Sequence, residues 1–134
     1  MKEVHGKLPA KQTLWLVLLP MVATFVCQRL YLHFVGIRHI FPGGYLVHHL
    51  FIGITIELPA AFILAFGTRN HSLGLLAPVA LGVGSAMILD EVTYLFVTNA
   101  TDKDYVSRVS VFGAIGMISL AAIVLFALYW FHRE

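Results

Sequence analysis

Apolar residues occur along this chain in four long runs, separated by short polar or glycine-containing breaks. A helix needs about 20 mainly apolar residues to cross the hydrocarbon core of a bilayer, and each run is long enough. We therefore predict four membrane-spanning helices, at residues 14–36, 45–67, 74–97 and 109–131. Because the breaks are short and rich in turn-forming residues, consecutive helices are expected to run in opposite directions. The predicted fold is a single all-α domain over residues 1–134, an antiparallel up-down bundle.

The composition agrees with this pattern, since 59% of the 134 residues are hydrophobic and only 12% are charged. A soluble single domain of this length cannot bury so many apolar side chains, so we predict a multi-pass integral membrane protein. The basic residues are dispersed and the formal net charge is +2. No concentrated basic patch results, which argues against a nucleic-acid partner. Cys27 is the single cysteine of the sequence, so no disulfide is expected within the chain.

Basic residues in the breaks predict the orientation of the chain in the membrane. The two sides would carry Lys2, Lys7, Lys11, Arg69 and Arg133 on one and Arg29, Arg38, Lys103 and Arg108 on the other. The bias of five against four widens to five against two if Arg29 and Arg108 serve a site within the membrane. We therefore expect a cell-membrane protein with both termini in the cytoplasm. No small-x-small cleavage site of a signal peptide follows the first apolar run. We therefore interpret this run as an uncleaved membrane span.

Ionisable residues occur inside the predicted spans, where each is costly unless it is paired or hydrated and is therefore a functional candidate. Counted from the outer helix ends at about 1.5 Å per residue, they fall in one layer close to the outer surface. All four spans contribute to this layer. Its members are Arg29, His33, His48, His49, Asp90, Glu91, Tyr105 and Arg108. The convergence predicts a polar pocket that opens toward the outer leaflet.

Helical geometry indicates which of these side chains can meet. Neighbouring residues on a helix point about 100° apart, so each of the doublets His48-His49 and Asp90-Glu91 is expected to contribute one inward side chain. Asp90 is favoured because it continues a row of small residues at spacing four from Gly82, a pattern typical of close helix contact in membranes. A similar row favours His49 in the second span.

Recognition of a lipid phosphate is the first chemistry that such a pocket could perform. Arg29 and Arg108 would donate to the phosphate, with His49 as nucleophile or general base and Asp90 orienting its imidazole. Arg29 and His33 lie four residues apart and share one face of the first span, so both can address one anion. The catalytic candidates are His48, His49, Asp90 and Glu91, and the substrate-binding candidates are Arg29, His33, Tyr94, Tyr105 and Arg108.

Three alternatives remain open. A divalent metal is the first, because imidazole and carboxylate ligands suit Zn, Mn or Fe. The predicted ligands are His33, His49, Asp90 and Glu91. The second alternative is a proton or ion relay that continues from the pocket to Glu57, near the bilayer centre. In the third, Asp90 and Arg29 form a buried ion pair that only fixes the register of the helices.

Two sequence motifs carry a resemblance to a known family. They are His48-His49-Leu50-Phe51-Ile52-Gly53 and Leu89-Asp90-Glu91, followed by Asp104-Tyr105 and Ser107-Arg108. The chain resembles small prokaryotic integral membrane proteins that have a His-His-x-x-x-Gly motif and a Leu-Asp-Glu motif, over roughly the second to fourth spans. More faintly, its architecture is similar to four-helix membrane enzymes that act on lipid headgroups.

The leading functional expectation is a pocket that binds the phosphate-bearing headgroup of a lipid or isoprenoid and hydrolyses or transfers it. The alternatives are a non-enzymatic metal-binding membrane protein and a small helical subunit whose ion pairs only hold the helices together. The expected partner is membrane lipid, with a second copy of the chain or another membrane protein as further candidates.

Overall fold

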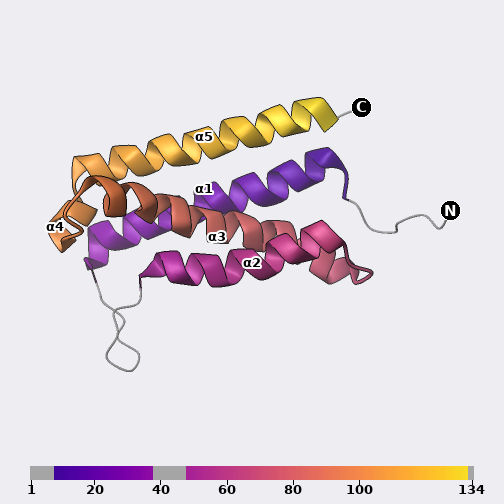
Figure 1. The fold of residues 1–134 in the computed structure, drawn as a ribbon, viewed down its shortest axis with the longest axis horizontal. Helices are drawn as coiled ribbons and strands as arrows, with labels where there is room; N and C mark the ends of the chain where they lie inside the picture. The colour runs from indigo at the N-terminus through magenta and orange to yellow at the C-terminus, as the bar shows by residue number, and fades with distance from the viewer. Residues whose placement is uncertain (1–7, 38–47, 133–134) are drawn as a thin grey trace, which may run out of the picture.

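The computed structural model describes residues 8–37 and 48–132, which form five helices and no strands (Figure 1). The four long helices are α1 (Ala10–Val35), α2 (His49–Phe66), α3 (His71–Val97) and α5 (Arg108–His132), and the short α4 spans Asp102–Tyr105. Each long helix is apolar and long enough to cross a membrane. The prediction of an all-helical chain with four such segments is confirmed.

The helix ends explain why the predicted breaks occur where they do. Gly36 ends α1 with a φ of +80° and Gly67 ends α2 with a φ of +75°, a left-handed conformation that glycine adopts without steric cost. At the start of α3 the side chain of Asn70 accepts a hydrogen bond from the backbone N–H of Leu73, which satisfies one donor of the first turn.

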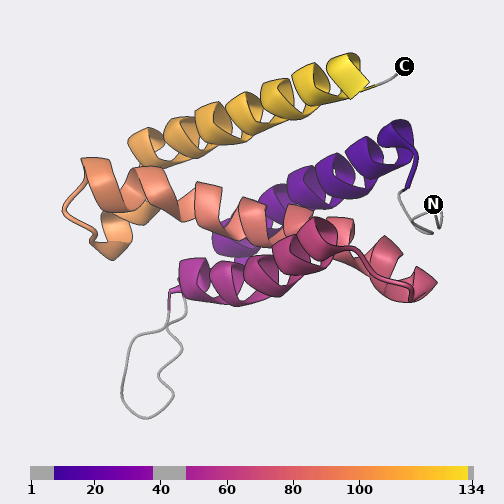
Figure 2. The same cartoon turned by 45° about the vertical axis from the view of Figure 1, so that its right-hand side comes forward.

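Helix α3 is the central element, because it packs against α1, α2 and α5. Within the described residues, α2 contacts no other long helix, whereas α1 also packs against α5. The arrangement is therefore three helices around α3, and α5 diverges from α2 and α3 toward its C-terminal end (Figure 2). The first turn of α1 and the last turn of α5 lie at the same end, opposite α4 (Figure 1).

Small residues allow these helices to approach closely. A Cβ atom on Gly82 would lie 2.2 Å from the backbone oxygen of Val17 on α1, and one on Gly84 would lie 2.7 Å from the backbone oxygen of Gly53 on α2. The predicted row on α3 is confirmed as a contact face, since its members are all buried: Gly82, Ala86, Asp90 and Tyr94. Backbone-to-backbone contact of this kind is how membrane helices associate without a hydrophobic driving force.

Many large apolar side chains of the described residues are exposed. The buried core cluster is small and consists of Leu18, Met21, Ala86 and Ile118. By contrast, Phe34 is 78% exposed and Phe66 87% exposed, and they belong to a large set of exposed apolar side chains on all four long helices. Exposed surface of this extent is what a bilayer requires of a spanning protein and what water does not tolerate.

The predicted spans agree with the observed helices to within a few residues at each described end. The predicted start of the second span, at residue 45, lies outside the described residues. Helix α4 is the one element that the hydrophobic pattern did not predict. Thr101 begins it with a capping box, in which its side chain accepts from the backbone N–H of Asp104 and the Asp104 carboxylate accepts from the backbone N–H of Thr101. Because α4 turns the chain between α3 and α5, it brings Tyr105 back over the end of the helices.

Candidate functional site

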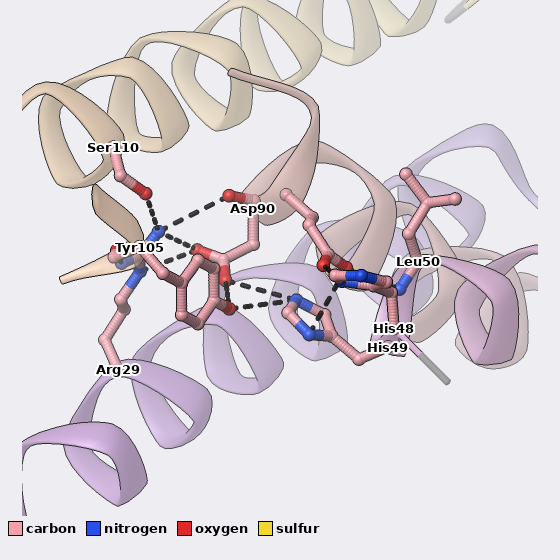
Figure 3. Close-up of polar contacts among 8 residues, drawn as sticks. Arg29, His48, His49, Leu50, Asp90, Tyr105 and Ser110 are labelled. Atoms are coloured by element: carbon pink, nitrogen blue, oxygen red, sulfur yellow. Dashed lines mark hydrogen bonds and ion pairs between the residues drawn. The ribbon is translucent and has the colours of Figure 1, made fainter. Parts of the chain in front are cut away.

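The site is built around the ion pair of Arg29 on α1 and Asp90 on α3 (Figure 3). The Arg29 Nε donates to Oδ1 of Asp90 over 2.6 Å, and Nη2 lies 2.6 Å from the same oxygen. Asp90 is fully buried, whereas the Arg29 side chain keeps 14% of its surface exposed. The remaining guanidinium donors bind the backbone oxygens of Tyr105 and Asp90 and the hydroxyl of Ser110, at 3.1 to 3.4 Å. Arg29 therefore has its donors directed at groups of the protein itself.

Tyr105 extends the network from Asp90 toward α2. Its hydroxyl donates to Oδ2 of Asp90 over 2.6 Å and lies 3.0 Å from Nε2 of His49. Because the single phenol proton goes to Asp90, Nε2 of His49 is the donor in the second contact. Burial and the neighbouring Asp90 carboxylate both raise the pKa of the Tyr105 phenol, because each disfavours the phenolate. Tyr105 thus remains a hydroxyl donor at neutral pH.

Glu91 connects α3 to the start of α2. Its Oε2 accepts from the backbone N–H of Leu50 over 2.8 Å and lies 3.4 Å from Nδ1 of His49. Its other oxygen, Oε1, pairs with Nδ1 of His48. The carboxylate thus sits at the positive end of α2, where an anion is stabilised by the unpaired N–H groups of the first turn. Glu91 caps α2 and at the same time orients His48 and His49.

The network contains one fixed cation and two buried carboxylates, with two imidazoles between them. If both imidazoles are neutral, the charges of Arg29, Asp90 and Glu91 sum to −1. One proton on His48 or His49 makes the whole network neutral, and His49 lies 3.4 Å from a carboxylate oxygen on each side. The two imidazoles thus lie between the two carboxylates, where each ring can hydrogen-bond to at least one of them.

Six of the predicted site residues are brought together in this network, and the others are not. The connected residues are Arg29, His48, His49, Asp90, Glu91 and Tyr105. Tyr94 is buried and contributes only its ring, whose centre lies 5.0 Å from that of Tyr105. His33 is exposed on α1 and stacks edge-on with the neighbouring Phe34. Arg108 is exposed at the start of α5. Within the described residues, no polar contact joins either of these two to the network.

The prediction that each doublet contributes one inward side chain is wrong. Asp90 faces α1 and α4 while Glu91 faces α2, and both are buried. The reason is the central position of α3. Because other helices surround it on several sides, neighbouring residues of α3 can point in different directions and both be buried. On α2, His48 precedes the helix with an extended ψ of 144°, so the helical spacing of 100° does not separate it from His49.

Two features of the site were missed by the sequence analysis. Ser110 on α5 is fully buried and accepts from Nη2 of Arg29 over 3.3 Å. Helix α4, which carries Tyr105, was interpreted as part of a break. A signal for α4 was present, because Thr101-x-x-Asp104 resembles the capping-box pattern at helix starts. A buried serine in an apolar helix has no comparable signal.

The predicted metal-ligand set does not come together, because His33 lies apart from His49, Asp90 and Glu91. Those three residues direct their polar atoms at one another and at Tyr105, Arg29 and Leu50. Within residues 8–37 and 48–132, no group of three or more His, Cys, Asp and Glu side chains has the geometry to hold a metal ion.

The chain matches no protein-family model, no curated protein and no solved structure. The suggested family of small prokaryotic membrane proteins therefore stays a prediction from the two motifs, and the function has to be argued from the polar network alone.

Proposed function

We propose that the chain is a multi-pass protein of the cell membrane, with four antiparallel crossings and both termini in the cytoplasm. The polar network would then lie in the outer leaflet, roughly one to two turns below the headgroups. Support comes from the four long apolar helices and from the position of the network at the end opposite the first turn of α1 and the last turn of α5.

The function that the geometry supports best is recognition of a phosphate-bearing lipid headgroup by the two histidines. The observation that carries this proposal is that His48 and His49 are each 20 to 30% exposed while held from behind by fully or nearly fully buried carboxylates. A buried carboxylate fixes the orientation of an imidazole and stabilises its protonated form. Such an imidazole can donate to a phosphate oxygen and can act as a general acid or base on a phosphate ester.

His48 is the residue that would contact the headgroup. With Nδ1 engaged by Glu91, its other ring nitrogen, Nε2, has no hydrogen-bond partner among the described residues. The proposal does not use Arg29 to bind the phosphate, because its guanidinium is directed at Asp90, Tyr105 and Ser110. The exposed cations at this end, Arg108 and Lys103, would instead attract an anionic headgroup toward the site.

A second candidate is a purely structural role, and one observation favours it. Arg29 hydrogen-bonds to Asp90, Tyr105 and Ser110, and Glu91 caps α2, so the network ties all five helices together whether or not a ligand binds. Removing one partner of a buried ion pair costs about 3–5 kcal/mol because the other charge is left uncompensated. Replacing both partners by neutral residues avoids that cost.

Native mass spectrometry of the delipidated protein separates the two candidates. Titration with phosphatidic acid and with diacylglycerol of the same chain length measures the contribution of the phosphate. We expect phosphatidic acid to bind about tenfold more tightly, which corresponds to about 1.4 kcal/mol, and His48→Ala to abolish this preference while the folded yield is kept. The matched control is His71→Ala, which removes an exposed histidine at the opposite end of α3.

The same affinity for both lipids in the wild-type protein, or a preference retained by His48→Ala, would contradict headgroup recognition. The structural candidate is tested with Asp90→Asn, Arg29→Met and the double variant. It requires that each single variant lowers the folded yield and that the double variant restores it.

A further inference from the structure

A cavity of about 460 Å³ lies alongside α3, between α3 and α5. All four long helices contribute to its wall, and nearly all of the lining is apolar, including Met21, Leu81, Ile88 and Met117. Two polar side chains break this lining, Glu57 of α2 and Ser85 of α3. Glu57 follows His49 by eight residues, which is about 12 Å along the helix axis, so the cavity is separate from the polar network.

The close contact of α2 and α3 places Glu57 in this wall. A Cβ atom on Gly84 would lie 2.8 Å from Cβ of Glu57 and 3.0 Å from its backbone nitrogen. The absence of a side chain at Gly84 therefore lets the Glu57 backbone rest directly on α3. The Glu57 side chain then lies in the same wall as the next residue on α3, Ser85.

One oxygen of this carboxyl group is left unsatisfied. Oε2 of Glu57 is buried and has no hydrogen-bond partner among residues 8–37 and 48–132. A buried acceptor without a partner costs about 1–3 kcal/mol, and unpaired buried groups in native proteins mark places where a water, ion or ligand belongs. A single water needs two to four polar partners, and Glu57 and Ser85, the two polar residues of the described lining, supply only the minimum while the rest of the wall is apolar. An occupant that is mostly apolar and has one hydrogen-bond donor fits the lining better.

We propose that this cavity binds a lipophilic amine, whose apolar body lies against the α3 and α5 side chains and whose nitrogen donates a hydrogen bond to the carboxyl group of Glu57. Charge complementarity favours an amine over an alcohol. A carboxyl group and an amine that share one proton form a pair with no net charge, either as two ions or as two neutral groups, and an N–H or O–H donor is present in both cases. Such a pair keeps uncompensated charge out of the hydrocarbon region, and its hydrogen bond is charge-assisted when ionised.

Photolabelling tests the proposal in nanodiscs that contain the full chain. The probes are a dodecylamine with an aliphatic diazirine near its tail and the dodecanol of the same design. We expect the amine to label wild-type protein at least fivefold more than the alcohol does, with adducts in the cavity-lining segments of α3 and α5. Glu57→Gln should lower amine labelling to the level of the alcohol, and Thr55→Val, an exposed position two residues away, should leave it unchanged.

A second variant keeps the proposal testable if Glu57→Gln does not fold. Ala121→Phe on α5 fills the cavity from the opposite wall and should reduce amine labelling at least fivefold with Glu57 intact. The proposal is overturned by equal labelling with amine and alcohol, by adducts outside the cavity, or by labelling that persists in both cavity variants. Loss of headgroup recognition in His48→Ala does not bear on this site, since Glu57 lies about 12 Å from His49 along the axis of α2.

Discussion

Tyr105 is the residue through which three helices exchange polar contacts. Its hydroxyl joins Asp90 of α3 to His49 of α2, and its backbone oxygen accepts from Arg29 of α1. The guanidinium carbon of Arg29 also lies 5.1 Å from the centre of the Tyr105 ring, within the range of a cation–π contact. A single aromatic side chain on a four-residue helix thus completes the environment of the buried Asp90 carboxylate.

We predict that Tyr105→Phe lowers the free energy of unfolding by about 1–3 kcal/mol at pH 8, because Asp90 and His49 each lose a buried hydrogen-bond partner. Burial and the Asp90 charge raise the pKa of this phenol in the folded protein. Its contribution is therefore complete below the ordinary phenol pKa of about 10 and declines as the pH rises above that value. Chemical denaturation in detergent micelles, followed by circular dichroism at pH 8 and pH 11, measures both effects.

The difference between wild type and Tyr105→Phe should be smaller at pH 11 than at pH 8. The control is Tyr31→Phe, at an exposed position on α1, which should show no such difference. A gap between wild type and Tyr105→Phe that is constant or grows with pH would show that the phenol is not buried against Asp90.

The sequence was informative about the depth of polar residues but not about their direction. Depth follows from the helical rise, which is the same for every residue, so Arg29, His49 and Asp90 could be assigned to one layer. Direction depends on which helices surround a span. His33 shares a face with Arg29 by spacing yet lies exposed, because α1 extends one turn beyond the residues that cover Arg29. Only the packing of α1 against its neighbours could reveal that difference.

At the scale of elements, α3 is the helix on which the others depend, because it contacts each of them. Its glycines determine how close those contacts are. Gly82 lies against the backbone of α1, where no side chain can move aside. The small-residue pattern predicted this face from the sequence, since only small residues at spacing four permit such an approach. The pattern could not show that α2 would contact α3 and no other long helix within the described residues.

We predict that Gly82→Ala destabilises the protein by about 1–3 kcal/mol, the usual cost of overpacking a well-packed contact. The new Cβ would lie 2.2 Å from the Val17 backbone oxygen, so α1 and α3 must separate. Gly116→Ala on α5 is the matched control, because a Cβ there meets nothing within 4 Å and alanine favours the helix. Unfolding midpoints of the two variants in the same detergent provide the comparison, and equal midpoints would refute the tight α1–α3 contact.

At the scale of the whole molecule, the polar network lies at one end of the long axis, the end that carries α4. Beyond it the long helices expose mainly apolar side chains. The structure also changes the charge count that predicted the orientation. Arg29 belongs to the network but Arg108 is exposed, so the predicted bias becomes five basic residues against three rather than five against two. The same orientation is favoured by a smaller margin.

We predict that the ends of the molecule face opposite sides of the cell membrane, with the α4 end outside. Two single cysteines in a chain with Cys27→Ser test this, Ser72→Cys near the start of α3 and Asn99→Cys between α3 and α4, both at exposed positions. A membrane-impermeant maleimide added to intact cells should label Asn99→Cys at once and Ser72→Cys only after the membrane is permeabilised. Because α3 would cross the membrane between the two positions, they are expected on opposite sides, and the positive-inside bias predicts that the α4 end is the outer one. The reverse pattern would place the polar network toward the cytoplasm, where its headgroup ligand would have to come from the inner leaflet.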